Sequence, residues 1–428
     1  MKSFRDPVHN LIALGESDQL LVDLINTREV QRLRRIRQLG LSNIAYPGAE
    51  HSRFVHSLGV LHLMRRIFDE KAWMAGPFTD SLTDYRHLAM SAALLHDLGH
   101  GPFSHAIEAV TGQRHEAWTT AIIRSPNTEV HQVLENYETG FAEQVAKVIE
   151  KNFKPSRAVV KLLSSQLDMD RTDYLLRDAL MTGAGYGSFD VEWLLHAMRI
   201  GEVAGEPEVG LDLEMGKSIA EDYIMCRYYM YLHVYFHRTT RAAEVLVEKL
   251  LQRARDIRAK IDGFTGLRAL LDGSLKASAD HVTDYLELDD AMLWTAMHLW
   301  SRSDDFILRD LADRLLNRKI FRSIDVIDTA EKDLWMSRLG EWAQKTGYLG
   351  KYYVIYDTAD SHAYHDPYVV HQGHGSGSIF LFDELGRAHD LSDESFLVQA
   401  VRNRRVQVRR VLAPGEWIFA IKDFATDV

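Results

Sequence analysis

Ten residues, HDLGHGPFSH at positions 96–105, hold three histidines and an aspartate together with two glycines and a proline. Imidazole and carboxylate groups serve as metal ligands and acid–base catalysts, whereas glycine and proline interrupt helices. A cluster this dense predicts a chemical site at the end of a helix rather than a set of structural histidines. Gly99 is expected to end that helix in a left-handed conformation, with His96 and Asp97 in the last turn.

An adjacent His-Asp pair needs further ligands to hold a metal ion, and the flanking segments offer them. The upstream segment EHSRFVHSLGV contains His56, and the downstream segment QLDMDRTDYLLRDAL contains Asp170. With His96 and Asp97 they form a mixed nitrogen and oxygen set, which suits Mn²⁺, Fe²⁺, Mg²⁺ or Zn²⁺. Such a set leaves room for water and substrate, as a catalytic site does.

The elements that must position these groups are mostly helices. Apolar residues recur at three- and four-residue steps in 18–39, which predicts an amphipathic helix or a broken pair, and similar segments continue to about residue 335. A Gly- and Glu-rich stretch at 201–216 suits a loop or a small hairpin. From residue 352 onward, β-type runs flank one helix. We therefore predict a mainly α fold: a helical core at 1–335, with the motif region at about 50–180, and a small α/β C-terminal domain at 336–428.

The C-terminal domain contains one strongly basic run, RNRRVQVRR at 402–410. The sequence leaves three interpretations open: a subunit contact, a nucleotide anchor or a solvated face.

The composition is that of an ordinary globular chain of 428 residues, of which 46% are apolar and 26% charged. Its single cysteine, Cys226, rules out an intrachain disulfide and favours a reducing compartment. No apolar run approaches the roughly 20 residues that span a bilayer. We expect a cytoplasmic protein with no membrane partner. The formal charge of −11 disfavours non-specific nucleic-acid binding, so nucleic acid is not required and local charge must meet any anionic ligand.

The ordered set HSRFVHSLGV, HDLGHGPFSH, RHEAW and LDMDRTDYLLRDAL resembles the HD-domain phosphohydrolases. It is most similar to their deoxynucleoside triphosphate triphosphohydrolase branch, which includes SAM-and-HD-domain enzymes, and the match runs from about residue 2 to 250. The resemblance implies an HD-domain helical core and the metal ligands His56, His96, Asp97 and Asp170. It also implies hydrolysis of a deoxynucleoside triphosphate (dNTP) at the α-phosphorus to deoxynucleoside and inorganic triphosphate, by water that the metal activates.

The leaving 5′-oxygen needs an acid, and histidine is the natural donor near neutral pH. We assign this role to His105, with Glu108 on the same helix face to orient the ring. His100, and His115 with Glu116, match family positions near the α-phosphate. Their division among acid, stabiliser and positioning roles stays open.

A triphosphate carries more negative charge than one divalent ion neutralises. By family resemblance, the phosphates are contacted by Arg53, Arg171, Arg227 and Arg238, whose guanidinium groups suit phosphate oxygens. A second Mg²⁺ is expected to arrive with the triphosphate.

Sugar and base contacts are expected from the helix that carries Asp170. Asp170, Asp173, Tyr174, Arg177 and Asp178 fall at steps of three and four, so they share one face, although Arg177 is expected to form a salt bridge. Asp178 would bind the ribose 3′-hydroxyl with help from Gln38, and Tyr174 would lie against sugar and base. Tyr235 stands where the family crowds out a 2′-hydroxyl.

The mammalian member of this branch forms tetramers through nucleotides bound between subunits. Lys2, Phe4, Asp6 and Arg34 match residues of its guanine-reading site, but Asn26 replaces an aspartate. An amide cannot accept two donors from the guanine edge. We expect a homo-oligomer, a dimer or tetramer, without GTP-specific activation; activation by another nucleotide, or none, stays open.

Two rival functions also stay open. One is an HD phosphohydrolase acting on a nucleoside monophosphate, a cyclic dinucleotide or a nucleic acid end. The arginines favour a polyphosphate instead, and we find no further His-rich set for a two-metal phosphodiesterase. The other is a nucleotide-sensing assembly protein, against which the complete ligand quartet argues. The base preference and the native metal are not specified by the sequence.

Overall fold

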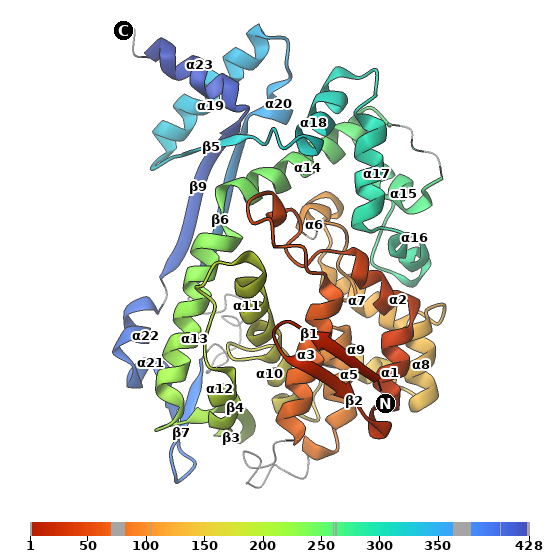
Figure 1. Ribbon diagram of the computed structural model, residues 1–428, viewed down its shortest axis with the longest axis vertical. Helices are drawn as coiled ribbons and strands as arrows, with labels where there is room; N and C mark the ends of the chain where they lie inside the picture. Colours follow the sequence, from red (N-terminus) through yellow and green to blue (C-terminus); the bar gives the residue numbers. More distant parts are fainter. Residues whose placement is uncertain are drawn as a thin grey trace.

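The computed structural model describes residues 2–69, 82–103, 105–259, 261, 263–362, 378–402 and 404–425. Helices make up most of the described residues, as predicted, and the same residues also form three small sheets (Figure 1). Within these ranges, no helix combines the length and the apolar character needed to cross a bilayer.

The helical body occupies the first three quarters of the chain. Its helices are α1 (Gln19–Asn26), α2 (Arg28–Arg32), α3 (Arg53–Asp69), α5 (Arg86–Leu95), α6 (His105–Thr111), α7 (His115–Arg124), α8 (Glu129–Tyr137), α9 (Phe141–Ile149), α10 (Arg157–Leu163), α11 (Met169–Thr182), α12 (Val191–Ala197), α13 (Gly216–Met230), a π-helical turn (Tyr231–Tyr235), α14 (Arg238–Asp256), α15 (Thr265–Asp272), α16 (Val282–Leu286), α17 (Asp290–Trp300) and α18 (Phe306–Leu316).

The amphipathic stretch at 18–39 is a broken pair, α1 and α2. Thr27 lies at the break in extended conformation, where its hydroxyl oxygen accepts a hydrogen bond from the Val30 N–H and caps α2. Such a cap supplies a partner that the first turn of a helix lacks. One of the two predicted alternatives is therefore confirmed.

Two glycines allow the helices of the site to approach closely. A Cβ atom at Gly59 of α3 would lie 1.8 Å from Oδ1 of Asp173 on α11, so only glycine fits. Gly99 is not left-handed, and the prediction of a left-handed helix end was wrong. A Cβ at Gly99 would instead lie 2.2 Å from the His115 carbonyl oxygen and the Thr119 nitrogen of α7. Close packing of the turn after α5 against α7 is the reason for glycine there.

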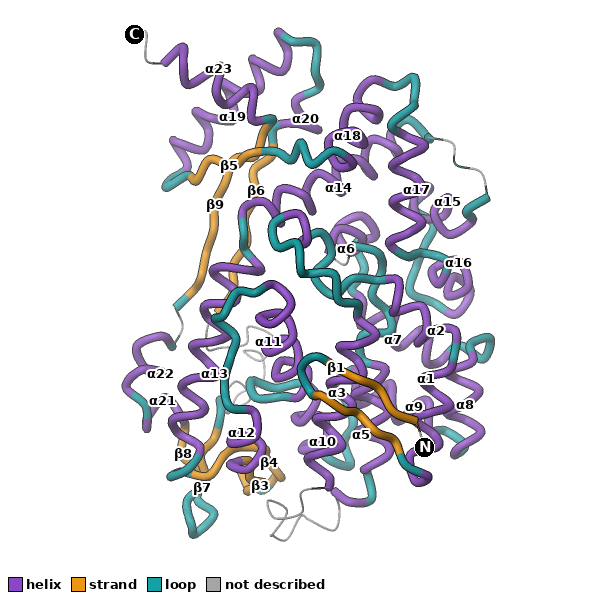
Figure 2. The backbone as a smooth tube through the Cα atoms, viewed as in Figure 1, coloured by secondary structure: helices purple, strands orange, loops and turns teal. Residues whose placement is uncertain are grey.

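The strands form three sheets, shown in orange in Figure 2. Strand β1 (Lys2–Asp6) pairs with β2 (Asn10–Leu14); β3 (Met198–Val203), β4 (Glu206–Asp212), β7 (Phe380–Phe382) and β8 (Ala388–Asp390) form the second sheet; β5 (Arg322–Asp325), β9 (Arg405–Ala413) and β6 (Ile355–His362) form the third, in that order. The hairpin predicted near 201–216 is confirmed as β3–β4, turned by Ala204 and Gly205, both with positive φ.

The C-terminal part combines strands with short helices. It adds α19 (Thr329–Lys345), α20 (Gly350–Tyr353), α21 (Leu391–Glu394), α22 (Phe396–Val401) and α23 (Gly415–Ala425) to the strands. The predicted boundary at 335/336 falls inside α19, and β7 pairs with β4 of the helical body. Residues after 336 therefore contribute to two sheets on different parts of the molecule.

Candidate metal centre and active site

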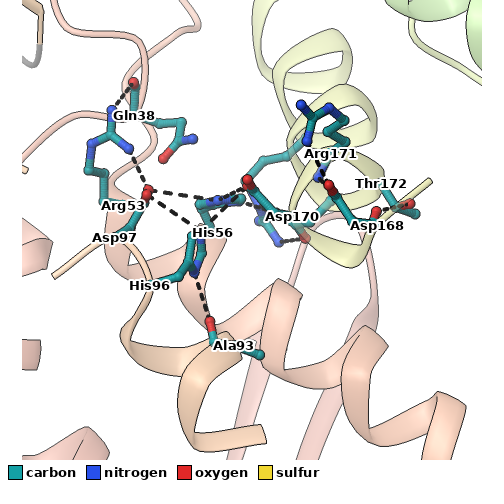
Figure 3. A network of polar contacts seen from close by, with 12 residues as sticks. Gln38, Arg53, His56, Ala93, His96, Asp97, Asp168, Asp170, Arg171 and Thr172 are labelled. Carbon is teal, nitrogen blue, oxygen red and sulfur yellow. Dashed lines mark hydrogen bonds and ion pairs between the residues drawn. The ribbon is translucent and has the colours of Figure 1, made fainter. Parts of the chain in front are cut away.

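The four predicted metal ligands converge from three elements (Figure 3). His56 lies in α3, His96 and Asp97 in the turn that ends α5, and Asp170 in the first turn of α11. One ligand atom from each of His56, His96 and Asp97 lies within 4.8 Å of the others. Oδ1 of Asp170 lies 3.1 Å from Nε2 of His56 and 3.4 Å from Nε2 of His96. The quartet therefore surrounds one point.

The donor set fits a divalent cation. Nδ1 of His96 lies 2.9 Å from the Ala93 carbonyl oxygen, which can only accept, so Nδ1 carries the proton and Nε2 presents a lone pair. Nε2 is buried and has no hydrogen-bond partner within the described residues, although it lies 3.4 Å from oxygens of Asp97 and Asp170. A buried lone pair facing two carboxylates is the arrangement that a metal completes.

Protons compete with a cation for this site. Burial disfavours the charged form of His56, but hydrogen bonds with Asp170 and Asp173 and the nearby carboxylate charges outweigh it and raise the pKa of His56 to about 10. An ion that binds Nε2 must therefore displace a proton at neutral pH.

Asp173 orients His56 from behind. Its Oδ2 lies 2.8 Å from Nδ1 of His56, its Oδ1 lies 2.6 Å from Nε2 of His9, and Arg177 donates to both of its oxygens. Arg177 also binds Asp6, so the predicted salt bridge on this helix face is confirmed. The hydrogen bond fixes the imidazole with Nε2 toward the metal point.

The backbone of the turn that carries His96 and Asp97 is held by three side chains that do not belong to the predicted site residues. Arg32 is fully buried and donates to the carbonyls of Leu98 and His100, and Tyr285 donates to Gly99 O at 2.7 Å. Thr119 accepts from Gly99 N at 2.9 Å and donates to His96 O at 3.0 Å. The sequence signal for Arg32 was its position, because it is an arginine on the buried face of 28–32.

Asp97, His100 and His115 form a second group with ligand atoms within 4.8 Å of one another. Nε2 of His100 lies 3.2 Å from Oδ1 of Asp97, and the rings of His100 and His115 stack with centroids 3.7 Å apart. No further His-rich set for a two-metal phosphodiesterase was expected; this group shares Asp97 with the quartet and comes together because α7 returns His115 to the turn after α5.

Glu108 contacts a histidine other than its predicted partner. Oε1 of Glu108 lies 2.5 Å from Nδ1 of His115, and Glu116 is paired with Arg114 at 3.1 Å. His105 begins α6, as predicted, but its side chain lies outside what the structure describes.

A cavity of about 410 Å³ opens beside the quartet of predicted metal ligands. It is lined by Gln38, Arg53, Tyr174, Asp178 and Tyr235 among others. Arg53 connects the two, because its guanidinium donates to the Asp97 carboxylate. Oε1 of Gln38 is buried and has no partner in the described part of the chain. All four predicted sugar and base contacts thus line this cavity.

Asp178 has one protein partner on each carboxylate oxygen, which leaves further acceptor sites. Its Oδ2 accepts from the Tyr235 hydroxyl at 2.9 Å, and its Oδ1 lies 2.8 Å from Nε2 of His51. His51 was not predicted, although it belongs to the same EHSRFVH segment as His56. The three side chains form a hydrogen-bonded row at the cavity edge.

Two further predicted arginines lie near the cavity without lining it. Arg171 pairs with Asp168 at 2.6 Å, and Arg227 donates to Gln166 at 2.6 Å. Both charges act on the hydroxyl of Tyr174, whose pKa burial raises well above its usual value. Nε of Arg227 is buried and lacks a hydrogen-bond partner among the described residues, so it is available to an anion.

The structure does not bring Arg238 to this cavity. Its side chain is 60% exposed, lies 3.6 Å from Asp325, and lines a separate cavity of about 290 Å³ with Arg318 and Arg322. The break between the π-helical turn and α14 turns it away from Tyr235. The prediction that Arg238 contacts substrate phosphates needs this correction.

The predicted regulatory residues divide into two sets. Lys2, Phe4 and Arg34 lie together. Nζ of Lys2 lies 2.5 Å from Oδ1 of Asn26 and 5.4 Å from the centre of the Phe4 ring. Burial and the nearby charge of Arg34 lower the pKa of Lys2. Asp6 is only 7% exposed and is held in the ion pair with Arg177. The regulatory role of Asp6 stays a prediction, and in the structure Asp6 holds Arg177 beside Asp173.

Comparison with known proteins agrees with this geometry. The HD domain family model matches residues 53–178, which include all four ligands. Uncharacterized protein YwfO of Bacillus subtilis is 39% identical over 421 residues, covering 97% of this chain and 93% of YwfO. The crystal structure of a phosphohydrolase from Bacteroides thetaiotaomicron has a TM-score of 0.81 at 26% identity, covering 96% of this chain and 99% of that one.

More distant relatives have a named reaction. Deoxynucleoside triphosphate triphosphohydrolase SAMHD1 of Gallus gallus is 26% identical over 354 residues, which cover 75% of this chain and 56% of SAMHD1. The HD-domain match, the full-length relationship to YwfO and the convergent quartet lead to one conclusion: the chain belongs to the HD-domain phosphohydrolases.

Proposed function

We propose that this HD-domain phosphohydrolase hydrolyses dNTPs to deoxynucleoside and inorganic triphosphate. The observation that carries the proposal is the cavity of about 410 Å³ that adjoins the metal quartet through Arg53 and presents Tyr174, Asp178 and Tyr235 on one wall. A nucleoside in this cavity has its 5′ end toward Asp97. The distant similarity to SAMHD1 supports the same substrate class.

The sugar would be read by the hydrogen-bonded row of His51, Asp178 and Tyr235. A 3′-hydroxyl donates to Asp178, whose charge the Tyr235 hydroxyl and His51 already orient. The Tyr235 ring, which lines the cavity, is proposed to leave no space for a 2′-hydroxyl. The buried amide oxygen of Gln38 supplies a further acceptor.

The phosphates would be bound by Arg53, Arg171 and Arg227, with a second Mg²⁺ arriving with the triphosphate. The buried Nε of Arg227 provides a donor that has no partner among the described residues, and the rings of His100 and His115 lie beside Asp97. These groups bind and orient the α-phosphate beside the quartet.

A divalent ion held by His56, His96, Asp97 and Asp170 would lower the pKa of a bound water and polarise a phosphoryl oxygen. The chain supplies the rest: Asp173 fixes His56, Arg53 orients Asp97, and Glu108 orients His115. His105 is proposed to protonate the leaving 5′-oxygen.

A second candidate is hydrolysis of another nucleotide, a monophosphate or cyclic dinucleotide, by a two-metal mechanism. The group of Asp97, His100 and His115 favours it, because Asp97 could bridge two ions. Metal content separates the two: a dNTP triphosphohydrolase requires one resident ion per chain, whereas this alternative requires two.

Assembly is a further part of the proposal. We expect a dimer or tetramer, with Lys2, Phe4 and Arg34 contributing to any nucleotide site at its interface. The hydrogen bond of Lys2 to Asn26 supports a site that differs from a guanine-reading one. A nucleotide-sensing role without catalysis would give assembly and no product.

The deciding experiment incubates purified protein and Mn²⁺ with each dNTP, each NTP, dAMP and a cyclic dinucleotide, with mass detection of products. We expect deoxynucleoside and triphosphate from dNTPs. Asp97→Ala and Asp170→Ala should abolish turnover with loss of bound metal, and His105→Ala should lose rate while keeping metal. Phosphate release, or retained turnover in Asp97→Ala, would overturn the proposal.

A further inference from the structure

One row of side chains in the β5–β9–β6 sheet faces residues 231–241, the segment that leads into α14 and forms its first turn. Arg410 of β9 is the register partner of Asp325 in β5 and of Asp357 in β6. The row therefore presents an acidic, a basic and an acidic side chain across three neighbouring strands. Figure 1 shows β9 and β6 running beside the point where α13 leads into α14.

Each member of the row contacts that segment. Nη1 of Arg410 donates to the Phe236 carbonyl oxygen at 2.7 Å. Asp357 accepts from Arg241 at 2.6 and 3.3 Å, and Asp325 lies 3.6 Å from Arg238. The signs complement one another along the whole row, and Asp357 and Arg410 are only 5% and 8% exposed.

The contacted segment forms one end of the substrate cavity. Tyr231, Tyr235, Phe236 and Arg241 all line it. The helix is interrupted here by the π-helical turn and by the extended ψ of 131° at His237. Carbonyls at a helix end lack partners within the helix, and Arg410 supplies a charge-assisted donor to one of them.

We propose that Arg410 and Asp357 are positioning residues that set substrate fit, because they fix the turn that carries Tyr231 and Tyr235. The inference rests on the proposed function for its substrate, but not for its structural content. It also distinguishes the members of the basic run 402–410: Arg410 is buried against the cavity wall, whereas Arg409 is exposed and pairs with Gln407.

The test compares Arg410→Gln and Asp357→Asn with the control Arg409→Gln, a neighbour on the same strand. Losing one partner of a buried charged hydrogen bond is expected to raise KM for dATP about tenfold while kcat stays within about twofold. The ratio of kcat/KM for dATP to that for ATP should fall in the same variants. Bound metal should not change, because neither residue contacts the quartet.

Hydrogen exchange gives a readout that does not depend on turnover. Amides of residues 231–241 should exchange faster in Arg410→Gln and Asp357→Asn than in the wild type or Arg409→Gln. Unchanged exchange and KM in both variants, or an equal effect of Arg409→Gln, would overturn the inference. Loss of metal with loss of kcat would also overturn it.

If the wild type does not hydrolyse dNTPs, the proposed function fails, and faster exchange confined to 231–241 still supports the positioning role. Should Arg410→Gln lower the melting temperature too far, Asp357→Asn carries the same comparison.

Discussion

Glu108 holds His115 in one orientation: its Oε1 lies 2.5 Å from Nδ1 of the ring and accepts from the His115 backbone N–H at 3.1 Å. A carboxylate can only accept, so Nδ1 carries the proton. Nε2 then carries a lone pair, and the His115 ring stacks on His100, with which Asp97 and His115 form the second group of ligand atoms. This contact gives Glu108 a role in the site through His115.

Glu108→Gln is expected to lower kcat about tenfold to hundredfold, because it removes the charge that orients His115. Bound metal should not change, because Glu108 does not belong to the quartet. Steady-state kinetics together with elemental analysis of bound metal checks both points. Glu138→Gln, an exposed carboxylate after α8, is the control. A normal kcat in Glu108→Gln would show that orientation of His115 is unimportant.

Gly59→Ala should act in the opposite direction from most glycine substitutions in helices. Such a change usually stabilises a helix by about 0.5–1 kcal/mol, but here Cβ would overlap Oδ1 of Asp173 at 1.8 Å and Nη2 of Arg177 at 2.5 Å. We expect a loss of about 1–3 kcal/mol in unfolding free energy. Metal affinity should fall about tenfold or more, since Asp173 orients His56.

Urea denaturation and competition with a metal chelator measure the two effects of Gly59→Ala. Gly340→Ala in α19 is a matched control, because nothing lies within 4 Å of its added Cβ. It should be neutral or stabilising, with normal metal affinity. Equal behaviour of the two variants would mean that the contact of α3 with α11 does not constrain the site.

The metal quartet could be predicted from sequence because each ligand stands in a motif with its own local signal. His96 and Asp97 are adjacent, and His56 and Asp170 belong to dense polar segments. The partners of these ligands could not be predicted, because they depend on how helices pack. The contact of Glu108 with His115, seven residues away in sequence, depends on how α7 packs against the turn after α5. Periodicity places residues on a face but does not determine what lies opposite.

The same limit applies to the arginines and to the C-terminal part. Arg53 and Arg238 both match phosphate-binding positions, but only Arg53 lines the cavity, because the chain turns between Phe236 and Arg238. The basic run 402–410 gave no indication that one arginine would face inward. Its pairing with both β5 and β6 arises from strands more than 40 residues away in sequence.

Thr119 should be needed for its hydroxyl rather than its shape. The hydroxyl accepts from Gly99 N and donates to His96 O, so Thr119→Val leaves a buried donor and a buried acceptor unpaired. We expect a loss of about 2–4 kcal/mol in unfolding free energy and weaker metal binding, since the turn holds His96 and Asp97. Thr119→Ser keeps both hydrogen bonds and should keep metal affinity. Chelator competition with the three proteins checks this, and weakened binding in Thr119→Ser would contradict it.

Asp290 should make stability fall as pH rises through the acid range. Its carboxylate accepts from the backbone N–H groups of Arg37 and Phe103, which connect two loops of the site. Burial nevertheless raises its pKa from 3.8 to about 6. Between about pH 4 and 6 the folded protein keeps a proton that the unfolded chain releases, so the unfolding free energy decreases with rising pH, by at most about 3 kcal/mol. Asp290→Asn cannot titrate and should lack this decrease, although it loses an acceptor at every pH. Urea denaturation of the metal-free wild type and Asp290→Asn at pH 4.5 and pH 7 gives the difference between their unfolding free energies at each pH. If this difference is the same at both pH values, or favours the wild type more at pH 7, Asp290 is already ionised at pH 4.5.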